Sequence, residues 1–336
     1  MGEEADMIPF YRPFPLPSDT NNRFRAQVLK ILWTREYTKG TLSDELADKI
    51  AERTGYEFAI PTGSGTAAIM LLARWYKHLG MKRIKAPWFT WKSTYETFRW
   101  CGYDIRFVDI DRQTYLADFG DIKPDYDELR CPVDTFGSVY PMKDARNDEY
   151  IPTPWVDSAQ SLGAKWDSTV PHRILSFSGS KLITTGEGGM ILTQEKSLMD
   201  FCLENDWFSR MSELQAALGL AYMDHIDEIL EKKRKLAQAY RTHFKNVEWQ
   251  VIPVESNDYI VAGLVDDPKK VMNDNPDVEF RRYYQSIVNE EGNDADVPHP
   301  WKFSTIYPNT QYVSDHILAF PAWPEMDIEA IKEIRV

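Results

Sequence analysis

The stretch EFAIPTGSGTAAIMLLARWYKHLG, residues 57–80, decides the expected fold. Its apolar start, 57–62, is typical of a short strand. A glycine-rich turn at 63–66 then leads into a largely apolar helix, 67–78, which Gly80 closes. A strand that passes through such a turn into a buried helix is typical of α/β proteins.

The same alternation continues on both sides of this stretch. Upstream, residues 41–55 predict a helix that Thr41 caps together with Asp44 and that Gly55 ends. Downstream, the pattern predicts a helix at 93–100 and strands at 83–87, 105–110, 130–135, 153–158 and 174–178. We therefore expect an α/β fold in which a mostly parallel sheet is sandwiched between helices.

The pattern changes after Gly189. Residues 212–244 predict a long helical region, and about ninety residues at the end are richer in Asn, Asp and Pro. These features predict a large domain over residues 1–240 and a small C-terminal α/β domain over residues 241–336. The first 30 residues are candidates for packing against the small domain.

Composition narrows the classes of function. The net charge of −13 argues against nucleic-acid binding, and no apolar run is long enough for a membrane span. Residues 1–15 are acidic and proline-rich, unlike a secretory signal. The three cysteines, Cys101, Cys131 and Cys202, are far apart, so we expect no metal site or disulfide framework. This pattern fits a reducing, cytoplasmic location.

The turn at 63–66 predicts a phosphate site. Ser64, Gly65 and Thr66 precede and begin a helix whose free N–H groups and positive dipole end favour an anion. With Ala68, the turn also matches G-x-G-x-x-A, the dinucleotide fingerprint of nicotinamide dehydrogenases. That alternative needs a carboxylate at the end of the next strand, which instead ends in Ala86 and Pro87. The dehydrogenase hypothesis is weakened accordingly.

Three further residues suggest chemistry. Lys181 follows a strand within SFSGSKLITTGEGG (176–189), although a surface lysine is the ordinary interpretation of such a residue. Asp157 ends a strand, where it either binds a ligand or caps a helix together with Gln160. Trp91 either stacks on a flat ring or packs in the core. Core packing suits Trp88 and Phe89 at least as well. A phosphate cradle, a carboxylate, an aromatic ring and a lysine together are what pyridoxal phosphate requires.

The sequence resembles the DegT/DnrJ/StrS sugar aminotransferase family, a group of fold-type-I pyridoxal-phosphate enzymes. The similarity runs along most of the chain. It is carried by SGTAAIMLL (64–72), APWFTWKSTYETFRWCGYDIRFVDID (86–111), VDTFGSVYPM (133–142), VDSAQSLGA (156–164), SFSGSKLITTGEGGMILT (176–193), RMSELQAALGL (210–220) and ILAFPAWPEMDIEAIKEI (317–334).

The resemblance implies a role for each matching residue. Lys181 would carry the cofactor as a Schiff base and move the proton, and burial should lower the pKa of its amine. Asp157 would pair with the ring nitrogen and Gln160 would lie by the phenolic oxygen. Trp91 would stack on the ring, and the phosphate would be held by Ser64, Gly65, Thr66 and Ser176.

The resemblance also implies a reaction: transfer of an amino group from glutamate or glutamine to a keto-sugar, expected to be nucleotide-linked. Relatives with His in place of Lys181 are sugar dehydratases, so the lysine favours transamination. A cytoplasmic homodimer with shared active sites is expected. The alternatives are an aminotransferase for a cyclitol or another non-sugar ketone, and a catalytically silent regulator or scaffold.

The sequence departs from the family at several places. Phe208 stands where the family often has an Asn that reaches a neighbouring subunit's cofactor, so either Asn205 substitutes or that contact is missing. Asp134 stands where His is common. His299 and the Tyr307–Pro308 turn are candidates for the acceptor pocket, with a surface loop as the alternative interpretation.

Overall fold

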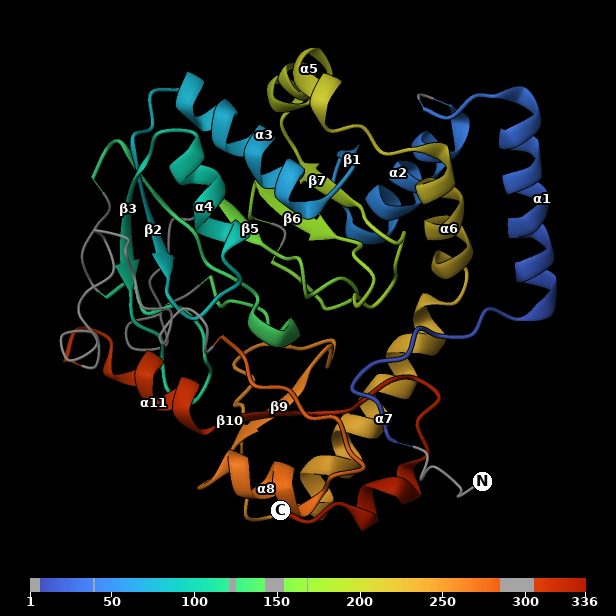
Figure 1. The fold of residues 1–336 in the computed structure, drawn as a ribbon. Coiled ribbons are helices and arrows are strands. Elements are labelled where there is room, and N and C mark those ends of the chain that lie inside the picture. The colour runs from blue at the N-terminus through green and yellow to red at the C-terminus, as the bar shows by residue number, and fades with distance from the viewer. Residues whose placement is uncertain (1–6, 39, 121–124, 143–153, 168, 285–304) are drawn as a thin grey trace.

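The computed structural model describes residues 7–38, 40–120, 125–142, 154–167, 169–284 and 305–336 (Figure 1). A four-stranded sheet lies at its centre. The strands follow the order β1 (Phe58–Thr62), β7 (Gly189–Thr193), β6 (His172–Ser176) and β5 (Trp155–Asp157). β5 and β6 are parallel, whereas β7 runs antiparallel to both β1 and β6.

A second sheet continues the parallel arrangement. β2 (Arg83–Pro87) lies between β3 (Asp104–Val108) and β4 (Glu128–Arg130), and both pairings are parallel. A parallel bridge between Val133 and Asp157 connects the chain after β4 to β5. The expected strand at 130–135 thus ends early, at Arg130, and only Val133 pairs beyond it. β7 was not predicted, because its apolar run directly follows the glycine-rich stretch.

Helices cover both faces of the central sheet (Figure 1). On one face, Ile174 and Ile191 pack with α3 (Gly65–His78), α4 (Ser93–Trp100) and α5 (Lys196–Asn205). On the other, Leu175 and Leu192 pack with α2 (Thr41–Thr54), α6 (Glu213–Met223) and the start of α7 (Ile226–His243). Successive residues of a strand therefore pack into two separate cores, one on each face of the sheet. The predicted α/β sandwich is confirmed.

The last third of the chain forms a smaller antiparallel sheet beside α7. Its order is β10 (Ile317–Phe320), β9 (Val261–Leu264) and β8 (Glu248–Trp249). It is accompanied by α8 (Pro268–Asp274) and α11 (Pro308–His316). The chain before α1 (Ser18–Thr34) also lies here, because Ile8 pairs with Val278 and Trp323 Nε1 donates to the Pro9 carbonyl at 3.1 Å. The domain boundary at residue 240 stays a prediction, since α7 runs through that position.

The N-terminus of α2 is capped from a distant helix. Its N-cap is Gly40, and the predicted cap by Thr41 and Asp44 is wrong. The buried Glu213 carboxylate at the start of α6 instead accepts from the N–H groups of Gly40 at 3.1 Å, Leu42 at 2.9 Å and Ser43 at 3.4 Å. A carboxylate offers more acceptor sites than a hydroxyl and complements the positive end of the helix.

We expect Glu213→Ala to lower the free energy of unfolding by about 2 kcal/mol, because one buried and two partly buried N–H groups lose a charged acceptor. Urea denaturation followed by circular dichroism measures this loss. Glu213→Gln keeps one acceptor oxygen and should lose roughly half as much. Equal stability of all three proteins would show that water replaces the carboxylate without cost.

Two negative findings concern the described residues only. No helix among them is both long and apolar enough to cross a membrane. They also contain no cluster of three metal-binding side chains. The cysteines at 101, 131 and 202 are free thiols.

Candidate functional site

Asp157 occupies the carboxyl end of β5 and is almost completely buried. The Thr94 hydroxyl on α4 donates to Oδ2 at 2.7 Å, and the Ala159 N–H donates to Oδ1 at 3.1 Å. Burial raises the pKa of Asp157, while these hydrogen bonds and the charge of Lys181 lower it. The carboxylate is thus held in a fixed orientation from two sides.

Lys181 lies in the turn that follows β6, the strand next to β5, and is half-buried. Its Nζ lies 5.1 Å from the centroid of the Tyr259 ring. Burial lowers the pKa of this amine to about 8, against an opposing contribution from Asp157. About a tenth of the amine is therefore uncharged at pH 7, and the uncharged form is the one that attacks a carbonyl carbon.

The turn at 63–66 lies against Ser176, the last residue of β6. Ser64 is the N-cap of α3, and its hydroxyl accepts from the Ala67 N–H at 3.1 Å. Gly65 begins the helix, with Thr66 next in its first turn. A Cβ placed on Gly65 would lie 3.0 Å from Ser176 Cβ and 3.2 Å from its Oγ. Glycine therefore lets the start of α3 approach Ser176 closely, and the sequence-predicted phosphate residues meet at one place.

One small pocket joins several of these residues. Ala159, Gln160, Ser176 and Lys181 all line it. The Gln160 side chain accepts from the Phe136 N–H at 2.6 Å and donates to the Tyr284 hydroxyl at 3.1 Å. The structure thus brings Gln160, which follows β5, together with Ser176 and Lys181, which lie at the end of β6 and in the turn after it.

Trp91 lies apart from the core. Its side chain is 59% exposed, whereas Trp88 is buried and stacks on Phe107 with ring centroids 3.7 Å apart. Phe89 is also fully buried. Core packing is therefore the correct interpretation for Trp88 and Phe89, and ring stacking by Trp91 stays a prediction.

Sequence reasoning missed three side chains of the site: Thr94, Tyr259 and Tyr284. Thr94 could have been found, because Thr90 and Thr94 are four residues apart at the start of a predicted helix and their hydroxyls lie 3.2 Å apart. The two tyrosines come from the C-terminal third, where the sequence has no strong period. Nothing in the pattern pointed to them.

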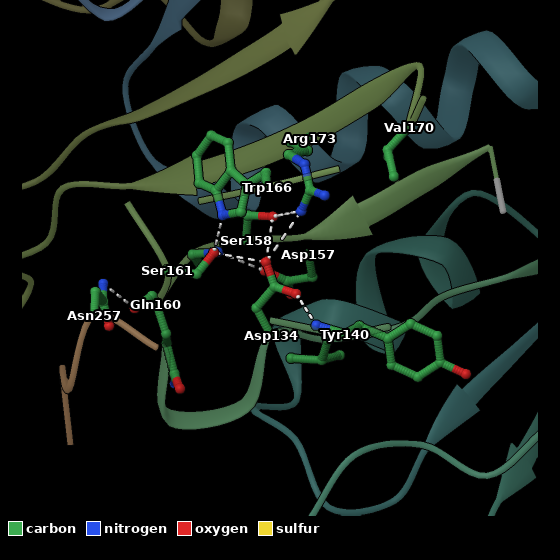
Figure 2. A network of polar contacts seen from close by, with 12 residues as sticks. Asp134, Tyr140, Asp157, Ser158, Gln160, Ser161, Trp166, Val170, Arg173 and Asn257 are labelled. Carbon is green, nitrogen blue, oxygen red and sulfur yellow. Dashed lines mark hydrogen bonds and ion pairs between the residues drawn. The ribbon is translucent and has the colours of Figure 1, made fainter. Parts of the chain in front are cut away.

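Asp134 is the centre of a buried polar network behind the site (Figure 2). Its Oδ2 accepts from the hydroxyls of Ser158 at 2.8 Å and Ser161 at 2.6 Å and forms an ion pair with Arg173 at 3.1 Å. Its Oδ1 accepts from the Tyr140 N–H at 2.8 Å. The residue that departs from the family pattern is therefore fully engaged within this chain.

The other residues singled out by comparison with the family pattern also have partners within this chain. Asn205 accepts from Arg74 at 3.3 Å and donates to the Phe201 carbonyl at 2.9 Å, and the Arg74 guanidinium lies 5.5 Å from the Phe208 ring centroid. The Tyr307 ring meets Trp88 edge-on at 6.0 Å, and Pro308 begins α11. His299, the other candidate for the acceptor pocket, lies outside the described residues.

Comparison with known proteins gives consistent matches. The model of the DegT/DnrJ/EryC1/StrS aminotransferase family matches residues 18–205 and 207–335. GDP-perosamine synthase of Vibrio cholerae is 24% identical, over 98% of this chain and 97% of its own. DesI, solved with its TDP-sugar product, superposes with a TM-score of 0.82 at 21% identity, over 98% of this chain and 91% of its own. The GDP-4-keto-6-deoxy-D-mannose-3-dehydratase of E. coli superposes with a TM-score of 0.80 at 16% identity, over 98% of both chains. The fold alone therefore does not separate amination from dehydration.

Proposed function

Because the chain belongs to the DegT/DnrJ/EryC1/StrS aminotransferase family, we propose that it moves an amino group from glutamate or glutamine to a nucleotide-linked keto-sugar. The enzyme is a pyridoxal-phosphate-dependent aminotransferase. One observation carries the proposal for the site: the buried carboxylate of Asp157 and the amine of Lys181 follow the ends of adjacent parallel strands and interact electrostatically. Ligands of α/β sheets bind at this edge.

The residues present fit pyridoxal phosphate. The start of α3 and the Ser176 hydroxyl lie so close that a Cβ on residue 65 would crowd Ser176, which fits a phosphate cradle made by Ser64, Gly65, Thr66 and Ser176. An amine whose pKa is lowered to about 8 suits bonding to an aldehyde. When bound, the cofactor supplies an aldehyde that condenses with amines and a ring that accepts an electron pair.

In the proposed mechanism, each side chain has one task. Lys181 accepts a proton at Nζ from the carbon of the amino donor and returns one at the acceptor stage, for which a pKa near the working pH is best. Asp157 presents a negative charge at a fixed position, because Thr94 and the Ala159 N–H orient its carboxylate. Gln160, held between Phe136 and Tyr284, presents its amide beside the same pocket.

Lys181 also supports transamination over dehydration. An amine at this position would hold the cofactor covalently between turnovers and would be the group that moves the proton. The names of the relatives support a sugar acceptor, since GDP-perosamine synthase of Vibrio cholerae and the UDP-4-amino-4-deoxy-L-arabinose–oxoglutarate aminotransferase of Shewanella sediminis both concern nucleotide sugars. An aminotransferase for a cyclitol is the second candidate.

We also propose that the enzyme works as a cytoplasmic homodimer. Leu29, Leu32 and Trp33 lie along one face of α1 and are exposed, Trp33 by 88%. Apolar side chains at this spacing are typical of a surface that a partner covers. Sedimentation equilibrium of the full chain tests the dimer, and a monomer at all concentrations would contradict it.

The function is tested by half-reactions of the purified holoenzyme. We expect an absorbance band at about 410–430 nm that glutamate or glutamine bleaches and that nucleotide-linked keto-sugars restore. Restoration by a keto-cyclitol but not by keto-sugars would favour the second candidate. A band that no amino donor bleaches would instead identify a catalytically silent protein.

The pKa of Lys181 predicts a pH dependence of cofactor uptake. Only the neutral amine attacks the aldehyde, so the uptake rate of the cofactor-free protein should rise with pH and level off above about 8. Below that value the rate should fall about tenfold per pH unit. Stopped-flow absorbance measures it, and a rate that keeps rising to about pH 10 would mean that the amine is not perturbed.

A further inference from the structure

The ion pair between Asp134 and Arg173 lies directly behind Asp157. Arg173 on β6 is paired with Val156 on β5, and its guanidinium donates to Ser158 Oγ at 2.9 Å as well as to Asp134 (Figure 2). Because successive strand residues point to opposite faces, Val156 and Ser158 face away from the side to which Asp157 points. Asp134 and Arg173 are both fully buried.

Asp134 holds in place the turn at 157–161, which carries Asp157 and Gln160. Its N–H donates to the Asp157 carbonyl at 3.0 Å, so its backbone lies beside that residue. Its carboxylate binds the hydroxyls of Ser158 and Ser161, the residues on either side of the Ala159–Gln160 segment. The Trp166 indole donates to the same Ser161 hydroxyl at 3.0 Å, and Arg173 lies 4.9 Å from the Trp166 ring centroid. The whole turn from 157 to 161 is thus tied to one carboxylate.

Asp134 also contributes to the electrostatic potential at Asp157, after burial, two hydrogen bonds and Lys181. The negative charge of Asp134 raises the pKa of Asp157, and the positive charge of Lys181 lowers it. The titratable neighbours Cys131, Tyr284 and Tyr56 all have raised pKa values, to about 12 for Tyr56, and are neutral at physiological pH. Asp167 lies further out, beside Tyr56. Arg173 is therefore the cation that offsets Asp134 at its own carboxylate.

We propose that Asp134 and Arg173 are a pair of positioning residues, which fix the turn bearing Asp157 and Gln160 and balance the charge behind Asp157. This inference rests on the proposed function, because it gives Asp157 the task of holding a proton on the cofactor ring. Neither residue touches the pocket itself, so both act through Asp157 and Gln160.

The electrostatic part is tested with variants that change the charge. The equilibrium dissociation constant of pyridoxal phosphate is measured from about pH 5 to 9 in proteins that all keep Lys181, whose amine titrates in the same range. The difference between their acid limbs therefore reports the change in the protonation of Asp157. Arg173→Met leaves Asp134 without its cation and should move this limb up by about one pH unit. Asp134→Asn should move it down, and the double variant Asp134→Asn/Arg173→Met should restore it. If the acid limbs of the unaltered protein, the two single variants and the double variant coincide, the proposed charge balance is wrong.

The positioning part is tested with a second double variant, Asp134→Leu/Arg173→Met, which is also charge-balanced but offers no acceptor to Ser158 and Ser161. Its acid limb should match that of the first double variant, while amide hydrogen exchange over residues 157–161 should become at least about tenfold faster. Unchanged exchange in that segment would overturn the positioning role. This readout needs no cofactor.

Two controls keep the outcomes separate. Lys85→Met breaks another ion pair with a buried carboxylate, Lys85–Glu128 at 2.9 Å, in the second sheet, and should lower stability without moving the acid limb. If Arg173→Met does not fold, the two charge-balanced double variants and Asp134→Asn still decide both parts. If the unaltered protein does not bind pyridoxal phosphate, the proposed function fails, and the exchange experiment alone decides the positioning role.

Discussion

Lys181→Ala should reduce amino transfer by at least about 10⁴-fold, the largest loss we expect from any single substitution. The variant lacks both the amine that bonds to the cofactor and the group that moves the proton. The absorbance band at about 410–430 nm should be missing, because it requires an imine with Lys181, and borohydride treatment should leave no cofactor covalently attached to the protein. Steady-state kinetics with glutamate and a keto-sugar measure the loss.

The fold should survive this change. Burial lowers the pKa of Lys181, so charging its amine in the folded protein costs free energy that alanine does not incur. Thermal unfolding should therefore show a protein at least as stable as the original at pH 7. Lys196→Ala, which removes an exposed lysine on α5 paired with Asp200, is the matched control and should retain full activity. Undiminished turnover in Lys181→Ala would refute the assignment.

Added primary amines sharpen the test. A small amine that enters the space left by Lys181 can take over the proton transfer, so methylamine should restore part of the activity in a concentration-dependent way. Rescue should increase with the fraction of neutral amine. Absence of rescue combined with normal cofactor binding would place the proton transfer on another group.

Asp157→Asn should lower the rate by about 10²–10³-fold, the second largest effect. The amide oxygen can still accept from the Ala159 N–H, and the amide NH2 can donate to the Thr94 hydroxyl, so the geometry at the end of β5 is kept while the charge is lost. The ring nitrogen then lacks the anion that keeps it protonated. Single-turnover kinetics should locate the loss in the proton-transfer step, with cofactor affinity reduced less.

A control separates this loss of charge from a loss of hydrogen bonding. Thr94→Val removes one donor to the Asp157 carboxylate and leaves its charge, so we expect about a tenfold smaller effect than for Asp157→Asn. A rate within about threefold of the original in Asp157→Asn would mean that another group protonates the cofactor.

The sequence predicted those parts of the molecule that depend on local patterns. The bounds of β2 and α4 were predicted at residues 83–87 and 93–100, where apolar period and turn residues agree. The turn at 63–66 and the helix after it were predicted because glycine and serine before an apolar run are typical of a helix start, and Ser64 is the N-cap of α3. Gln160 and Lys181 each follow the end of a predicted strand, and Ser176 lies within the second of these strands, so their meeting at one pocket agrees with the predicted α/β arrangement.

The parts that were missed depend on contacts between distant residues. Nothing near Gly40 indicates that a carboxylate 173 positions later will cap α2, so the local candidate Thr41 was preferred. The ion pair of Asp134 and Arg173 joins the end of one segment to the middle of another strand, and neither residue carries a pattern of its own. Tyr259 and Tyr284 reach the site only through the packing of the C-terminal third.

The place of β7 in the sheet has a consequence for how the chain folds as it leaves the ribosome. β1 emerges early, yet within the described sheet its sole neighbour is β7, whose residues are synthesised about 130 positions later. Until then the first strand has no partner for its hydrogen bonds, and the helix that follows it has no completed surface to cover. We therefore expect the nascent N-terminal third to stay open to chaperones, with the sheet closing in one late, cooperative step.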